Sequence, residues 1–175
     1  MSLFVMAHCH KRHKFKVRRI LVLAFYLCMC MLCYAQEIKV QDTFLGCSYG
    51  ESKTEVFQHL KSMGLEVKDK YEDILGIKYP NIGGIGFDFA NMFFYKGYFY
   101  KILFVIDGKN EKVCESIIHN IKNRLEEKYQ IKYPIENSFF YQDGTNDVSL
   151  YQLSNQVVLS YTNMKIRDFK ESQEL

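Results

Sequence analysis

Two stretches of the chain carry apolar residues at helical spacing, and each has a recognisable start. The first follows Ser52-Lys53-Thr54-Glu55, a capping box in which Ser52 caps the first turn and Glu55 returns to the Ser52 N–H. Gly64 is typical of a helix end. The apolar face between them consists of Val56, Phe57, Leu60 and Met63. The second helix follows Asp107-Gly108-Lys109-Asn110, and its apolar stripe consists of Val113, Ile117, Ile118, Ile121 and Leu125.

Extended segments rich in aromatic residues follow each helix. The predicted strands cover residues 65–79, 86–95 and 98–107 after the first helix, and 131–142, 147–153 and 156–162 after the second. The turns between them are short, which excludes a parallel sheet because parallel strands need long crossovers. The order helix-strand-strand-strand thus occurs twice. We expect an α+β fold, with an antiparallel sheet of about six strands and two helices on one face.

Strand register predicts which side chains face the helices. If Lys96-Gly97 is a two-residue turn, Tyr95 pairs with Tyr98 and Phe93 with Tyr100. This register places Phe89 and Phe104 in the core. The opposite, open face is expected to be the binding surface, with seven candidate residues: Met92, Phe94, Phe99, Lys101, Leu103, Phe140 and Tyr151. A contiguous apolar face often marks an interaction site; the alternative is that loops or the C-terminal tail cover it.

The first 35 residues have the pattern of a secretory signal. A basic run at residues 11–19 precedes an apolar stretch at 20–32, and Cys33-Tyr34-Ala35 forms a cleavage site before Gln36. The alternative is a membrane anchor, but the apolar stretch is shorter than the roughly 20 residues that a spanning helix needs. None of the leader cysteines follows a small residue, as lipidation would require. We expect 1–35 to be a signal peptide and 36–175 a single exported domain, periplasmic or secreted.

Removal of the leader changes the charge and the cysteine content. Residues 36–175 hold all 20 acidic residues but only 17 of the 23 basic ones, so the net charge becomes −3. Nucleic-acid binding therefore loses its electrostatic basis. Only Cys47 and Cys114 remain. In an oxidising compartment they could form a disulfide, and the alternative is two buried thiols.

The motifs of residues 36–175 indicate little catalytic chemistry. Gly46-Cys47-Ser48-Tyr49-Gly50 matches the Gly-x-Ser-x-Gly nucleophile elbow, but that elbow requires a parallel sheet and several preceding strands. His59 and His119 have no partner at metal-ligand spacing. We therefore expect no metal, no cofactor and no enzymatic activity. The alternatives are a small hydrolase that uses Ser48, or a carrier of a small molecule or lipid in an apolar cavity.

Residues around the first helix resemble a known group of exported bacterial domains. Phe44-Leu45-Gly46, then Gly50-x-Ser52-x-x-Glu55-Val56 and Gly64, are similar to the SmpA/OmlA outer-membrane-assembly lipoproteins and the β-lactamase-inhibitor-protein type. The inhibitor-like members have two such units in tandem, and similar openings occur in secreted proteins of Bacteroides-type bacteria. The lipoprotein members carry a lipobox, which this chain lacks. The resemblance implies a non-enzymatic protein-binding module of the cell envelope, whose partner it does not name.

Overall fold

A seven-stranded antiparallel sheet forms the centre of the computed structural model, which describes residues 38–129 and 138–172. The expected signal peptide and its cleavage site lie outside the described residues. The strand order is β3-β4-β7-β8-β11-β10-β9. The strands are β3 (Val67–Tyr71), β4 (Ile74–Lys78), β7 (Phe89–Tyr95), β8 (Tyr98–Asp107), β9 (Phe139–Gln142), β10 (Asn146–Leu153) and β11 (Gln156–Asn163).

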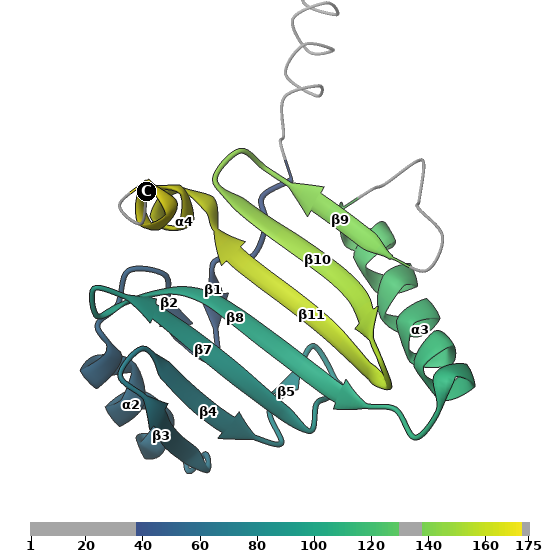
Figure 1. Cartoon of the computed structure of the whole chain (residues 1–175), viewed down its shortest axis with the longest axis horizontal. Coiled ribbons are helices and arrows are strands. Elements are labelled where there is room, and N and C mark those ends of the chain that lie inside the picture. Colours follow the sequence, from purple (N-terminus) through teal and green to yellow (C-terminus); the bar gives the residue numbers. More distant parts are fainter. Residues whose placement is uncertain (1–37, 130–137, 173–175) are drawn as a thin grey trace, which may run out of the picture. The chain divides into compact units, whose positions relative to one another are not determined.

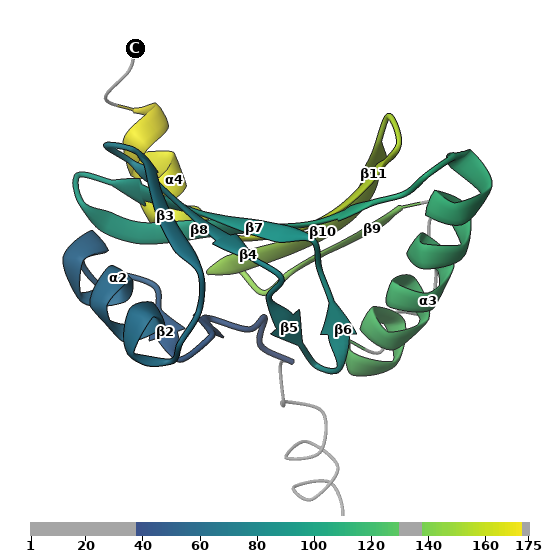
Figure 2. The ribbon, with the colours of Figure 1, turned by 90° about the horizontal axis from the view of Figure 1, so that it is seen from below.

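Two helices cover one face of this sheet, and a third lies on the other. Helices α2 (Lys53–Ser62) and α3 (Glu111–Tyr129) occupy the first face, whereas α4 (Met164–Glu171) lies at one end of the opposite face (Figures 1 and 2). Two small hairpins lie on the same side as α2 and α3 (Figure 2). They are formed by β1 (Thr43–Phe44) with β2 (Cys47–Ser48), and by β5 (Asn81–Ile82) with β6 (Ile85–Gly86). The predicted α+β class is confirmed.

Helix α2 begins and ends as the sequence predicts. The Ser52 hydroxyl accepts the Glu55 N–H, and the Glu55 carboxylate accepts the Ser52 N–H, which completes the capping box. Gly64 has φ +77°, a conformation that glycine adopts without strain at the end of a helix. Val56 and Leu60 are fully buried, so this short helix is held mainly by the sheet beneath it.

Helix α3 packs against the sheet through nearly the predicted stripe of residues, but the first residue of the stripe differs by one position. Its buried residues are Cys114, Ile118, Ile121, Leu125 and Tyr129. Val113, which was predicted to pack against the sheet, is exposed, and the neighbouring Cys114 is buried instead. Within the described residues, no helix combines the length and apolar character that a membrane span needs.

The two predicted repeats differ in their number of strands. The segment 65–79, expected to be one strand, turns at Glu72-Asp73 and forms the β3–β4 hairpin. The first unit therefore contributes four strands to the main sheet, and the second contributes the three that are described. The last strands of the two units, β8 and β11, pair at the centre of the sheet. Helix α4 was not expected from the sequence.

Candidate binding surface

A β-bulge in β8 decides which residues of the first large hairpin form the open face. The turn is as predicted, because Tyr95 pairs with Tyr98 and Phe94 with Phe99. The next residue of β7, Phe93, then pairs with Lys101 rather than with Tyr100. Tyr100 is thus the extra residue of a bulge. Past the bulge, each residue of β8 faces a partner one position away from the predicted one.

The prediction that Met92, Phe94 and Phe99 form an exposed binding surface is wrong. All three are buried in the core, with Met92 and Phe99 at 0% exposure. Phe89, predicted to be core, is only half-buried and lies on the other face. A one-residue difference in register exchanges the two faces of a strand. One residue of the sequence argues against the predicted register, because that register places the polar side chain of Asn91 in the core.

Aromatic packing explains why the core holds these residues so firmly. The Phe99 ring lies 5.0 Å from that of Tyr49 and 5.9 Å from that of Phe94, measured between centroids. Phe44 continues the cluster, with its ring centroid 4.8 Å from that of Tyr161. This chain of tilted rings joins β1, β7, β8 and β11 beneath the sheet. The bulge brings Phe99 into this cluster while Ile102 and Phe104, further along β8, also remain buried.

The remaining four candidates do lie on the open face. Phe140 is paired with Ser149 and Tyr151 with Val158, in the register expected for the last hairpins. Phe140 is 53% exposed and Tyr151 is 36% exposed. Lys101 and Leu103 are half-buried on β8, on the side opposite Ile102. The predicted cluster is therefore divided, with three residues in the core and four on the surface.

Exposed hydrophobic side chains concentrate on this open side of the sheet. Met63 and Val113 are exceptions that belong to α2's end and to α3. Strand register places five of the others on the open side: Tyr71, Tyr98, Phe140, Tyr151 and Leu153. Phe169 of α4 contacts Tyr95 on that side, and Tyr79 lines a hollow there together with Phe89. An excess of exposed apolar side chains on one face of a sheet is a feature that interaction sites share.

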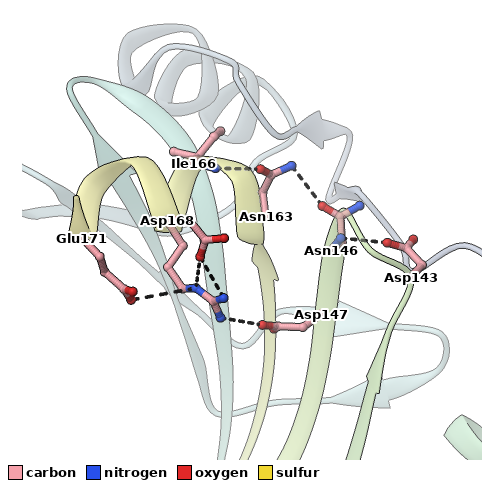
Figure 3. A network of polar contacts seen from close by, with 8 residues as sticks. Asp143, Asn146, Asp147, Asn163, Ile166, Asp168 and Glu171 are labelled. Carbon is pink, nitrogen blue, oxygen red and sulfur yellow. Dashed lines mark hydrogen bonds and ion pairs between the residues drawn. The ribbon is translucent and has the colours of Figure 1, made fainter. Parts of the chain in front are cut away.

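A polar network holds α4 against one end of the open face (Figure 3). The Asn163 side chain caps α4 by accepting the Ile166 N–H at 3.1 Å, and it donates to Asn146 Oδ1 at 3.0 Å. Arg167 forms an ion pair with Asp147 at 3.2 Å. Burial raises the pKa of Asp147, although the Thr162 hydroxyl and the Arg167 guanidinium act in the opposite direction. Helix α4 thereby forms a fixed wall of the open face.

The turn before β10 is organised by Asp143. Its carboxylate accepts the backbone N–H groups of Asn146, Thr145 and Val40 at 2.7–2.9 Å. Burial by itself would raise the pKa of Asp143, but these three hydrogen bonds outweigh it and lower the pKa below its ordinary value. The charged carboxylate thus ties residue 40 to the β9–β10 connection.

The structure places the two cysteines and the serine that the alternative chemistry would use. Cys47 and Cys114 are both free, buried thiols rather than a disulfide. Burial, with a contribution from the Glu51 carboxylate, raises the pKa of Cys47 to about 11, so it is not a reactive thiolate. Ser48 lies in the β1–β2 hairpin, where its hydroxyl is 3.1 Å from that of Thr43. In residues 38–129 and 138–172, no cluster of three His, Cys, Asp or Glu side chains could hold a metal.

Comparison with known proteins does not extend this description. No protein-family model, curated protein or solved structure matches the chain.

Proposed function

We propose that this chain is an exported, non-enzymatic protein-binding module of the bacterial cell envelope, and that it binds its partner through the open face of the sheet. The observation that carries this proposal is the gathering of exposed aromatic and aliphatic side chains on that face. An exposed apolar surface is unfavourable in water by about 25 cal/mol per Å² and is covered at low cost by a partner. The exported location of the protein is inferred from the leader, and the class of its partner is inferred from the resemblance at the first helix.

Site-specific photo-crosslinking tests the proposal. A photo-reactive residue is placed at Phe140 or at Tyr151, with Val113 of α3 as the control, because Val113 and Tyr151 have similar exposure of 39% and 36%. In envelope extracts, both open-face positions should give an adduct with the same protein, and position 113 should give none. Equal labelling from position 113, or an open-face position that reacts with no protein, would contradict the proposal.

A further inference from the structure

The edge of the open face formed by β3, β4 and β7 contains a hollow lined by lysines. Its volume is about 420 Å³, and Lys68, Lys70 and Lys78 contribute to its lining together with Phe89. The floor is Gly76 on β4, which pairs with Lys68 on one side and Asn91 on the other. Because Gly76 has no side chain, the stem of Lys70 can cross β4 directly above it. These strands are adjacent at one edge of the sheet (Figure 1).

Lys70 is held in this hollow by neutral groups. Its stem lies so close over Gly76 that a Cβ atom there would be 2.5 Å from Lys70 Cε. Its ammonium donates to Asn91 Oδ1 at 2.9 Å and lies 5.5 Å from the centroid of the Phe89 ring. Among the described residues, Lys70 forms no ion pair with a carboxylate, whereas the charge of Lys68 contributes to lowering the pKa of Glu66. The positive charge of Lys70 is therefore placed without a counter-ion.

The lining of the hollow also contains a third lysine and two carboxylates, and the carboxylates keep their negative charge because their hydrogen-bond donors are neutral. Lys78 is paired with Glu66 at 2.6 Å. Of the two acidic residues in the lining, Asp88 accepts the Asp107 N–H at 2.8 Å, and Asp107 accepts Gln156 Nε2 at 2.6 Å. An alternative role for lysines on an edge strand is to prevent that strand from pairing with another sheet. That role does not require the stem of Lys70 to be packed across β4 with its ammonium above an aromatic ring.

We propose that this lysine-lined hollow is the subsite of the open face that takes a carboxylate-bearing segment of the protein partner, with acidic side chains flanked by apolar ones. The inference rests on the proposed function and adds the charge of the partner to it. Ammonium groups next to an aromatic ring complement carboxylates that alternate with apolar side chains. The net charge of −3 for residues 36–175 disfavours a long polyanion such as nucleic acid, whereas a short acidic segment needs only the local lysines.

Binding of a defined peptide to the purified full chain tests the subsite. The probe is a labelled hexapeptide of alternating glutamate and phenylalanine, and the comparison probes are its glutamine counterpart and a ten-nucleotide oligothymidine. Nuclear magnetic resonance follows the side-chain signals of Lys68 and Lys70. We expect the glutamate peptide to shift these signals, the glutamine peptide to bind at least tenfold more weakly, and added salt to weaken binding.

Two variants separate a built site from general charge. Lys68→Gln combined with Lys70→Gln removes the charges, and Lys109→Gln combined with Lys112→Gln is the matched control on exposed lysines before and within α3. Gly76→Ala keeps every charge, but its methyl group displaces the flexible Lys70 side chain. We expect at least a tenfold loss for the first variant, at least threefold for Gly76→Ala, and less than twofold for the control.

The outcomes distinguish failure of the subsite from failure of the proposed function. Unchanged peptide affinity in the Lys68/Lys70 variant, no shift at these lysines, or tighter binding of the oligothymidine overturns the subsite. The crosslinks from Phe140 and Tyr151 lie on the other half of the sheet and report on the function separately. If they persist while the peptide fails to bind, the open face is a binding surface without an acidic subsite.

Discussion

The β7–β8 and β10–β11 hairpins look alike in the sequence but place their side chains differently. Both join two long strands through a two-residue turn, and both start pairing at the expected residues. The β10–β11 ladder continues without a shift from Leu153 and Gln156 to Asn146 and Asn163. The β7–β8 ladder shifts after two pairs. The same register argument therefore assigns the faces correctly in one hairpin and inverts β7 in the other.

The difference shows how much depends on one residue. In β10, alternation identifies the core, and Val148 and Leu150 are buried as expected. Strand β11 is buried on both faces, since Val158 and Ser160 on the open side are as covered as Leu159. In β7–β8, both faces are rich in large apolar residues, so alternation gives no clear preference. The aromatic cluster around Phe99 and the bulge at Tyr100 then decide which face is covered.

Single-residue deletions should produce the largest difference in stability between the two hairpins. Deletion of Tyr100 leaves Phe99 and Lys101 opposite Phe94 and Phe93, so it removes the bulge and keeps every pair. We expect a folded protein that is less stable by about 2 kcal/mol, from loss of the Tyr100 contact with α4. Deletion of Ser149 turns part of β10 onto the wrong face and should abolish cooperative unfolding. Near-ultraviolet circular dichroism and urea unfolding would measure both, and equal damage would contradict the bulge assignment.

Substitution of neighbouring phenylalanines should show the next largest contrast. Phe99→Ala should lower the free energy of unfolding by about 3–5 kcal/mol, because it opens a cavity in the aromatic cluster. Phe93→Ala, on the half-buried open side, should cost less than half as much. Guanidinium-induced equilibrium unfolding provides both values. A larger effect at Phe93 would mean that the two faces of β7 are exchanged.

Acid should weaken the connection that precedes β10 more than it weakens the β7–β8 turn. The pKa of Asp143 is lowered in the folded chain, so its contribution to stability is present above the unfolded value of 3.8 and is lost as the pH falls through the lower folded pKa. Asp143→Asn should reduce the stability at pH 7 by about 1 kcal/mol or less, since the carboxylate is partly solvated. It should also flatten the decline in stability below pH 4. A decline identical to that of the unaltered chain would contradict this role.

The smallest expected effect concerns the surface of the second hairpin. Phe140→Ser should change the free energy of unfolding by no more than about 0.5 kcal/mol, because this side chain is more than half exposed on an edge strand. The same variant should weaken partner binding if the open face is the binding surface. Leu150→Ala, on the buried side of the neighbouring strand, is the control and should cost about 2–5 kcal/mol. Thermal unfolding with the two variants side by side measures the difference.

The sequence by itself determined the features that depend on near neighbours. The capping box at Ser52 and Glu55, the stop at Gly64 and the tight hairpin turns are local, and all occur where they were predicted. The antiparallel α+β class followed from the short connections. A subtler local signal marks the start of α4, because Asn163 is its N-cap residue.

Only the tertiary structure decided the composition of the open face and of its lysine-lined hollow. Phe99 is buried because Tyr49 and Phe94, which lie far from it or across a turn, pack against its ring. The hollow depends on three adjacent strands, because the Lys70 side chain of β3 crosses Gly76 of β4 and reaches Asn91 of β7. Contacts between distant residues select one of two nearly equivalent registers, and the energy of that selection is not visible in either strand alone.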